Sequence, residues 1–173
     1  MTEHIIAQRL GMNLDNVIIE IPSESPPLFD DGSQPIAMGI LQTGLKEDPN
    51  HSLKYYAPTE TIAISNSRGG VLIYEPPAPG DDSARLQFDV GIDFPNAIGK
   101  QRIVFDLTPD VFTYASQART NCSFKDLLLF KTIGKLSPAT RDFGYTTKNI
   151  LIAGKFGYWN RPLMLHDGKS LEA

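Results

Sequence analysis

The chain has 173 residues, of which 41% are hydrophobic and 21% are charged, and its formal net charge is −4 at pH 7. This length suits one domain that buries enough apolar surface to fold without a disulfide or a structural metal. Because Cys122 is the single cysteine, an internal disulfide and a cysteine-based zinc site are excluded. The lysines and arginines are scattered along the sequence, which argues against non-specific electrostatic binding to nucleic acid.

The first residues carry no secretory or membrane signal. They lack a long apolar segment after a basic start, and no run in the chain approaches the roughly 20 apolar residues that span a bilayer. We therefore expect an intracellular, cytoplasmic protein without a membrane-spanning segment. A virion component made in the cytosol has the same appearance in sequence.

The N-terminal part is predicted to combine one helix with short strands and a long loop. Thr2 can cap a helix that runs to Leu10. Val17–Ile21 and Ile36–Thr43 alternate in side-chain type, which predicts two strands. Between them, residues 22–35 form a polar, proline-rich loop of a length that is typical of binding segments.

The clearest pattern lies at the centre of the chain, where residues 85–94 alternate between apolar and polar side chains without a break. A strand with one apolar face and one solvent-exposed polar face is typical of antiparallel sheets. Before it, Thr59–Ser65 and Val71–Glu75 flank a glycine-containing loop and predict a β-hairpin. After it, Arg102–Leu107 is the predicted partner strand. The alternating apolar residues, which predict one core face, are Leu86, Phe88, Val90, Ile92 and Phe94.

The C-terminal part is predicted to contain one or two helices followed by short strands. Thr108–Asp110 is a helix start, with a capping threonine and a proline in the first turn, and this helix should run to about residue 119. Phe124–Ile133 suits either a second helix or a buried strand. The last predicted strands are two or three of the segments 149–153, 156–159 and 163–165.

These elements predict a mainly β protein, an antiparallel β-sandwich or barrel of about eight strands with two or three short helices. No internal repeat is visible. Residues 1–173 are therefore expected to form a single β-rich domain, with proline-rich loops at 22–35 and 76–84.

No catalytic or cofactor-binding pattern stands out. The three histidines, His4, His51 and His166, lack the spacing that places two imidazoles on one helix face. Nucleophile elbows and phosphate-binding loops are absent, and Cys122 is expected to be a small, buried apolar residue. We predict no catalytic residue, no cofactor and no metal, and the sequence favours a protein that is not an enzyme.

Two groups of residues are candidates for contact with a partner. The second group is an aromatic strip interleaved with cations. Its rings are of the kind that stacks on single-stranded nucleic acid. The proline motifs of the first group resemble the partner-recruiting segments of enveloped-virus matrix proteins, although they cover too few residues to identify a family. The proline-loop candidates are Pro26, Pro27, Leu28, Phe29, Pro76, Pro77 and Pro79. The strip candidates are Phe156, Tyr158, Trp159 and Arg161.

The leading hypothesis is a non-catalytic structural or assembly protein, such as a matrix- or capsid-like virion component or a subunit of another complex. It implies a homo-oligomer or a protein assembly. Two alternatives stay open. One is a small-molecule-binding β-barrel or sandwich, with or without enzymatic activity. The other is a single-stranded nucleic-acid-binding module, which the net charge does not favour.

Overall fold

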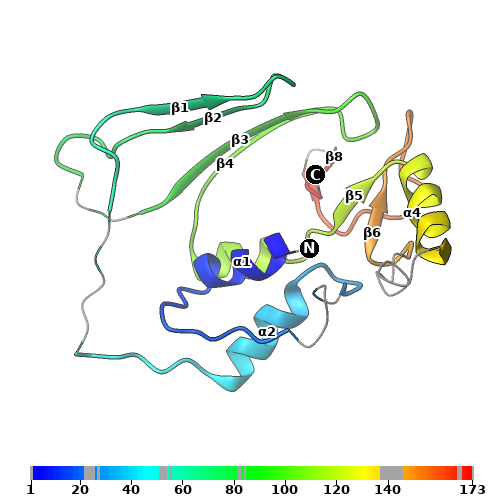
Figure 1. Ribbon diagram of the computed structural model, residues 1–173. Coiled ribbons are helices and arrows are strands. Elements are labelled where there is room, and N and C mark those ends of the chain that lie inside the picture. The colour runs from blue at the N-terminus through cyan, green and yellow to red at the C-terminus, as the bar shows by residue number, and fades with distance from the viewer. Residues whose placement is uncertain are drawn as a thin grey trace. The chain divides into compact units, whose positions relative to one another are not determined.

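The computed structural model describes residues 2–21, 26, 28–50, 54, 56–81, 83, 85–136, 146–166 and 169–172. This part of the chain contains four helices and short strands that pair two by two (Figure 1). The chain divides into two compact units. Unit 1 comprises Met1–Leu45 and Gln87–Ala173, and unit 2 comprises Lys46–Leu86.

The predicted fold class is confirmed only in part. Strands are present and pair mostly antiparallel, in the pairs β1–β2, β3–β4 and the minimal β7–β8, whereas β5–β6 is parallel. The described residues form a mixed α/β structure of separate two-stranded sheets, and none of these sheets closes into a barrel. The prediction of a mainly β protein with two or three helices is wrong in this respect.

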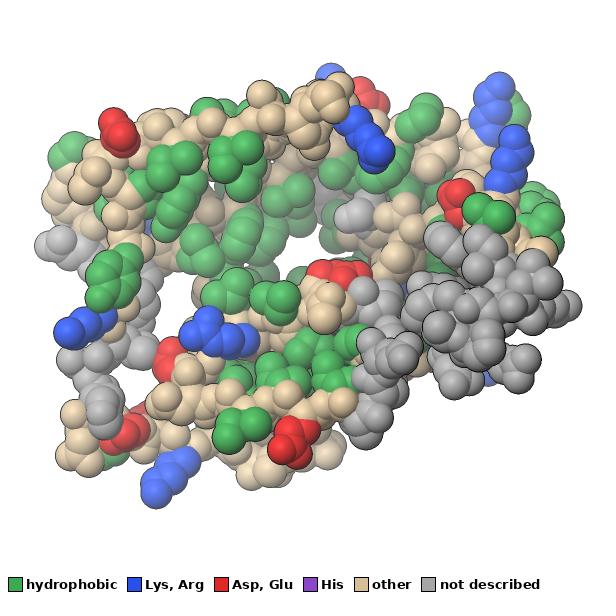
Figure 2. Space-filling model, viewed as in Figure 1, with side chains coloured by type: hydrophobic (Ala, Val, Ile, Leu, Met, Phe, Trp, Pro, Cys, Tyr) green, Lys and Arg blue, Asp and Glu red, His purple; other side chains and the backbone are tan. Residues whose placement is uncertain are grey.

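Unit 2 contains the predicted hairpin, formed by β1 (Ile62–Ser65) and β2 (Val71–Tyr74). The side chain of Asn66 shapes its turn by accepting hydrogen bonds from the backbone N–H groups of Arg68 and Gly70, both at 2.9 Å. Both strands are exposed along their whole length, and hydrophobic side chains lie on the surface in Figure 2. Within unit 2, the hairpin is held by its strand pairing and by its turn.

The hydrophobic core of unit 1 lies among helices. α1 (Thr2–Gly11), α2 (Gln34–Thr43) and α3 (Pro109–Ala115) enclose a buried cluster of Met12, Ala37 and Phe112. The last residue of α1 must be small, because a Cβ at Gly11 would lie 2.0 Å from Cγ of Phe112. This contact sets how closely α1 approaches α3.

Two predicted strands are absent from unit 1. Ile36–Thr43 belongs to helix α2, which carries a proline in its first turn and ends where Gly44 N–H donates to the carbonyl of Ile40. Val17–Ile21 is described without regular structure. Short apolar runs suit helices as well as strands, and the proline and glycine that bound α2 were the better signal.

The central strand is confirmed, but its expected core face is not. β3 (Gln87–Asp93) pairs with β4 (Lys100–Asp106), and the rings of Phe88 and Phe105 stack with centroids 5.4 Å apart. On the face expected to be core, Val90 keeps 41% of its surface exposed. A two-stranded sheet covers this face only partly.

The helix start at Thr108 is confirmed, since its side chain accepts a hydrogen bond from Val111 N–H at 3.2 Å. α3 ends at Ala115, before the predicted end. The open question about the next segment is settled by α4 (Phe124–Leu136), a helix that joins β5 (Thr120–Cys122) to the parallel strand β6 (Ile150–Ile152).

Two minimal strands close unit 1, β7 (Leu165–His166) and β8 (Lys169–Ser170). β6 is fully buried, as expected of a strand in a parallel pair. None of the helices in the described part of the chain has the length and apolar content needed to cross a bilayer.

Candidate functional site

A pocket of unit 1 forms where four segments meet: the start of α1, the loop that leads into α2, the start of β5 and the turn before β6. Its wall combines an apolar part with a polar part that holds an imidazole, two hydroxyls, a guanidinium and an amide. The apolar part and the glycine are Ile5, Pro26, Leu28, Phe29, Gly32 and Ile36. The polar residues are His4, Ser33, Arg119, Thr120 and Asn149.

His4 and Thr120 form the polar centre of this pocket. The Nε2 atom of His4 lies 3.2 Å from the hydroxyl oxygen of Thr120, so the two side chains are hydrogen bonded. Burial lowers the pKa of His4, and the nearby Glu3 carboxylate opposes this shift only in part. The imidazole is therefore uncharged at neutral pH and has a lone pair available on one nitrogen.

The loop before α2 is fixed against the segment that leads into β5. Ser33 N–H donates to the carbonyl of Ser116 at 2.8 Å, and the Gln8 amide donates to the carbonyl of Ser33 at 3.2 Å. Gly32 has a φ of +60°, and a Cβ there would lie 2.5 Å from the carbonyl oxygen of Ala118. Only glycine fits this approach, which brings the apolar wall next to Arg119.

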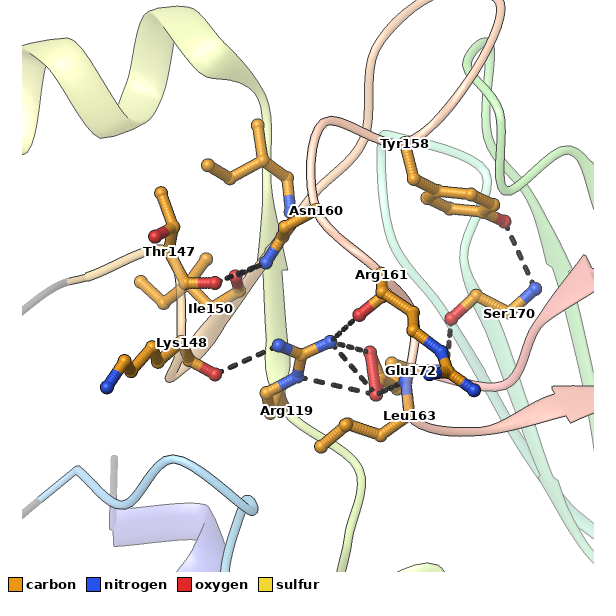
Figure 3. A network of polar contacts seen from close by, with 11 residues as sticks. Arg119, Thr147, Lys148, Ile150, Tyr158, Asn160, Arg161, Leu163, Ser170 and Glu172 are labelled. Carbon is orange, nitrogen blue, oxygen red and sulfur yellow. Dashed lines mark hydrogen bonds and ion pairs between the residues drawn. The ribbon is translucent and has the colours of Figure 1, made fainter.

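Arg119 is the anchor of a buried polar network (Figure 3). Its Nη2 atom lies 2.9 Å from a carboxylate oxygen of Glu172 and donates to the carbonyl of Arg161 at 2.8 Å. Its Nη1 atom donates to the carbonyl of Lys148 at 2.9 Å. The side chains of Arg119 and Glu172 are only 4% and 0% exposed. We call Arg119, Glu172 and the two carbonyls the Arg119 network.

The aromatic strip does not present a row of free rings. The Tyr158 hydroxyl donates to the carbonyl of Ala97 and accepts from Ser170 N–H, both at 3.1 Å. Trp159 stacks on Phe124 with centroids 4.7 Å apart, whereas Phe156 is 92% exposed. Arg161 enters the Arg119 network through its backbone carbonyl. Whether the strip contacts a partner stays a prediction.

The proline-loop candidates are divided between the two units. Pro26, Leu28 and Phe29 line the pocket beside His4, and Pro27 lies outside the described residues. The other three, in unit 2, follow β2: Pro76 is half-buried, and Pro77 and Pro79 are exposed. The structure thus brings part of one predicted group to the pocket, and their role toward a partner remains a prediction.

Sequence reasoning missed the polar residues of the pocket. His4 and Thr120 are 116 positions apart, and neither belongs to a recognisable motif spacing. The apolar segment around Phe29 was noticed, but as a partner contact. Cys122, two residues after Thr120, is half-buried, and burial together with the Asp126 carboxylate raises the pKa of its thiol. It is therefore not an activated nucleophile.

A complete metal site is not formed by the described residues, among which no three His, Cys, Asp or Glu side chains gather. The pocket lining supplies one imidazole, His4, and no carboxylate. His51 and the side chain of His166 lie outside the described part. These residues do not fit a zinc ion as a set.

Comparison with known proteins gives the family. Residues 1–168 match the family model described as "LpxC: UDP-3-O-acyl N-acetylglycosamine deacetylase". The chain is 30% identical over 143 residues to the bifunctional enzyme LpxC/FabZ of Chlorobaculum tepidum, which covers 82% of this chain and 29% of that protein.

Two UDP-3-O-acyl-N-acetylglucosamine deacetylases are also similar. The Acinetobacter baumannii protein is 29% identical over 130 residues, covering 72% of this chain and 40% of that protein. The Thermosynechococcus vestitus protein is 28% identical over 169 residues, covering 95% of this chain and 53% of that protein. The chain thus spans between 29% and 53% of the length of these three relatives.

These matches overturn the leading functional hypothesis. A non-catalytic structural or assembly protein, a virion component and a protein that is not an enzyme are all wrong, because the matching family consists of enzymes. The alternative of a small-molecule-binding protein with enzymatic activity agrees better with the matches. Since the family model covers nearly the whole sequence, the chain belongs to the LpxC family of UDP-3-O-acyl N-acetylglycosamine deacetylases.

Proposed function

We propose that this chain takes part in the hydrolysis of the N-acetyl group of a UDP-3-O-acyl-N-acetylglucosamine, with its pocket around His4 and Thr120 at the reacting amide. The observation that carries the proposal is the match of residues 1–168 to the deacetylase family. The second support is chemical: within unit 1, this pocket joins a neutral imidazole to a hydroxyl beside an apolar wall.

Amide hydrolysis makes two demands on a site. Negative charge develops on the carbonyl oxygen when water adds, and the departing amine needs a proton. In our proposal the Thr120 hydroxyl donates a hydrogen bond to that oxygen. The uncharged His4 imidazole accepts a proton from the attacking water at one nitrogen, which a charged imidazolium cannot do. The imidazolium that forms returns this proton to the departing amine.

The apolar wall serves to exclude water and to contact uncharged parts of the substrate. Leu28 and Phe29 are half-buried on this wall, so the pocket covers them only in part. A ligand that covers the remaining apolar surface gains hydrophobic stabilisation. Burial of the polar centre at the same time strengthens its hydrogen bonds to the substrate.

The direct test is release of acetate from UDP-3-O-acyl-N-acetylglucosamine by the chain and by two single variants. His4→Gln keeps a polar side chain of similar size but removes the imidazole, and Asp89→Asn is the matched control on the exposed surface of β3. We expect acetate release from the wild type and the control, and a loss of about a hundredfold or more in His4→Gln. Equal rates in the wild type and His4→Gln would overturn the assignment of the site.

Two further expectations remain proposals. We infer an intracellular location, which the family assignment supports. We also keep the expectation of self-association, and static light scattering of the purified chain tests it: a mass of one chain at micromolar concentration would refute it.

A further inference from the structure

The Arg119 guanidinium is engaged within the protein at all three of its nitrogen atoms. Its three nitrogen atoms donate to Glu172, to the carbonyl of Lys148 and to the carbonyl of Arg161. A guanidinium has five N–H groups, and this arrangement leaves little capacity to bind a substrate. Although Arg119 lines the pocket, its contacts are those of an anchor rather than those of a ligand-binding group.

The network holds both sides of the polar wall. Arg119 directly precedes Thr120, and its acceptor Lys148 directly precedes Asn149, so these two network residues are each followed by a pocket residue. β5 and β6 are also paired here, with Thr120 opposite Ile150. The guanidinium therefore ties the start of β5 to the turn that leads into β6.

Glu172 fixes this guanidinium from a part of the chain that does not line the pocket. One of its carboxylate oxygens also accepts from Leu163 N–H at 2.7 Å, and its own N–H donates to the Ser170 hydroxyl at 3.1 Å. The carboxylate is completely buried, so solvent does not screen the pair. These two hydrogen bonds fix the position of Glu172 independently of Arg119.

We propose that Glu172 is a positioning residue for the pocket, which holds Arg119 in place and thereby sets the Thr120 hydroxyl against the His4 imidazole. The catalytic meaning of this role rests on the proposed function. The geometric claim does not, because it concerns the His4–Thr120 hydrogen bond of the free protein.

A positioning role and a purely stabilising role predict different behaviour when the pair is replaced as a whole. Apolar side chains of similar volume often replace a buried ion pair without loss of stability. The double variant Arg119→Met/Glu172→Leu removes both charges together and should therefore still fold. Its melting temperature should fall, because the carbonyls of Lys148 and Arg161 and the N–H of Leu163 lose their partners. A positioning role requires the His4–Thr120 bond to change in this folded variant.

The experiment is 15N NMR of the His4 imidazole in the free chain at about pH 8, where an ordinary histidine is uncharged. The Nε2 shift reports the hydrogen bond to Thr120, and Thr120→Val gives the reference value for its loss. The double variant and the milder Glu172→Gln are compared with Asp89→Asn, which removes the charge from the exposed pair between Asp89 and Arg102. Melting temperatures are measured in parallel.

We expect the Nε2 shift of both network variants to move most of the way toward the Thr120→Val value, while Asp89→Asn leaves it in place. In the acetate-release assay, Glu172→Gln should lower kcat about tenfold to a hundredfold with little change in KM. An unchanged Nε2 shift in a folded double variant overturns the proposal, and if that variant does not fold, an unchanged shift in Glu172→Gln does so. A chain without deacetylase activity refutes the proposed function alone, because the NMR measurement needs no turnover.

Discussion

His4 and Thr120 lie within hydrogen-bond distance, 3.2 Å apart, although 116 positions separate them in the chain. The first belongs to α1 and the second to β5, so the bond forms only when both elements are in place. It makes the pocket a product of the tertiary structure. Folding and the ionisation of His4 are therefore linked.

The first prediction is that the His4 imidazole destabilises the fold when it is protonated. Burial lowers its folded-state pKa below the ordinary value of 6.5. Above pH 6.5 the imidazole is neutral in both the folded and the unfolded state. At lower pH the unfolded state binds the proton more tightly, so the free energy of unfolding decreases as the pH falls through the folded-state pKa.

Urea unfolding of the wild type and of His4→Gln between about pH 8 and about pH 5 measures this linkage. The wild type should lose more free energy of unfolding than the variant over this range. Comparison with the variant removes the contributions of the carboxylates and the other histidines. Parallel pH curves for the two proteins would contradict a lowered pKa for His4.

The second prediction contrasts two helical glycines. Alanine at Gly39 of α2 meets no atom within 4 Å, so Gly39→Ala should stabilise the protein by about 0.5–1 kcal/mol through helix propensity. Alanine at Gly11 of α1 meets the Phe112 ring at 2.0 Å. The overlap outweighs the gain in propensity, and Gly11→Ala should cost about 1–3 kcal/mol.

Thermal unfolding of both variants decides the point, since the same substitution has opposite expected signs. The double variant Gly11→Ala/Phe112→Leu should recover part of the loss if the clash with the ring is its cause. A Gly11→Ala protein as stable as Gly39→Ala would show that α1 and α3 do not approach as closely as described.

The third prediction concerns the start of α3. Thr108→Ala removes the acceptor of the Val111 N–H bond and should lower the free energy of unfolding by about 0.5–2 kcal/mol. Thr108→Ser keeps a hydroxyl at the same position and serves as the control, with most of the stability retained. If the two variants were equally unstable in urea, the hydroxyl would not be the capping group.

Local patterns in the sequence predicted local structure well. The alternation of residues 85–94 is strand β3, the turn between β1 and β2 is a hairpin, and Thr108 caps α3. In each case the decisive interactions lie within a few residues of one another or across one turn. Ile36–Thr43 shows the limit, because its apolar spacing fits a helix and a strand alike.

The site was beyond reach of the same reasoning for a physical reason. Its polar centre joins His4 to Thr120, and the Arg119 network joins Arg119 to Glu172 across 53 positions. Neither pair produces periodicity or a motif, since contacts between distant segments depend on how α1, β5 and the C-terminal segment pack. The spacing of the three histidines argues only against a shared metal site, and it gives no sign that His4 meets Thr120.

The measurement that tests the central claim most directly is an NMR titration of the chain with UDP-3-O-acyl-N-acetylglucosamine. Backbone amide shifts report where the ligand binds, whether or not turnover follows. Our account predicts that the largest changes occur at His4, Thr120 and Asn149, and that His4→Gln weakens binding or abolishes the change at Thr120. Largest changes at the exposed strip around Phe156, or no change at the pocket at saturating ligand, would contradict the claim that this pocket is the substrate site.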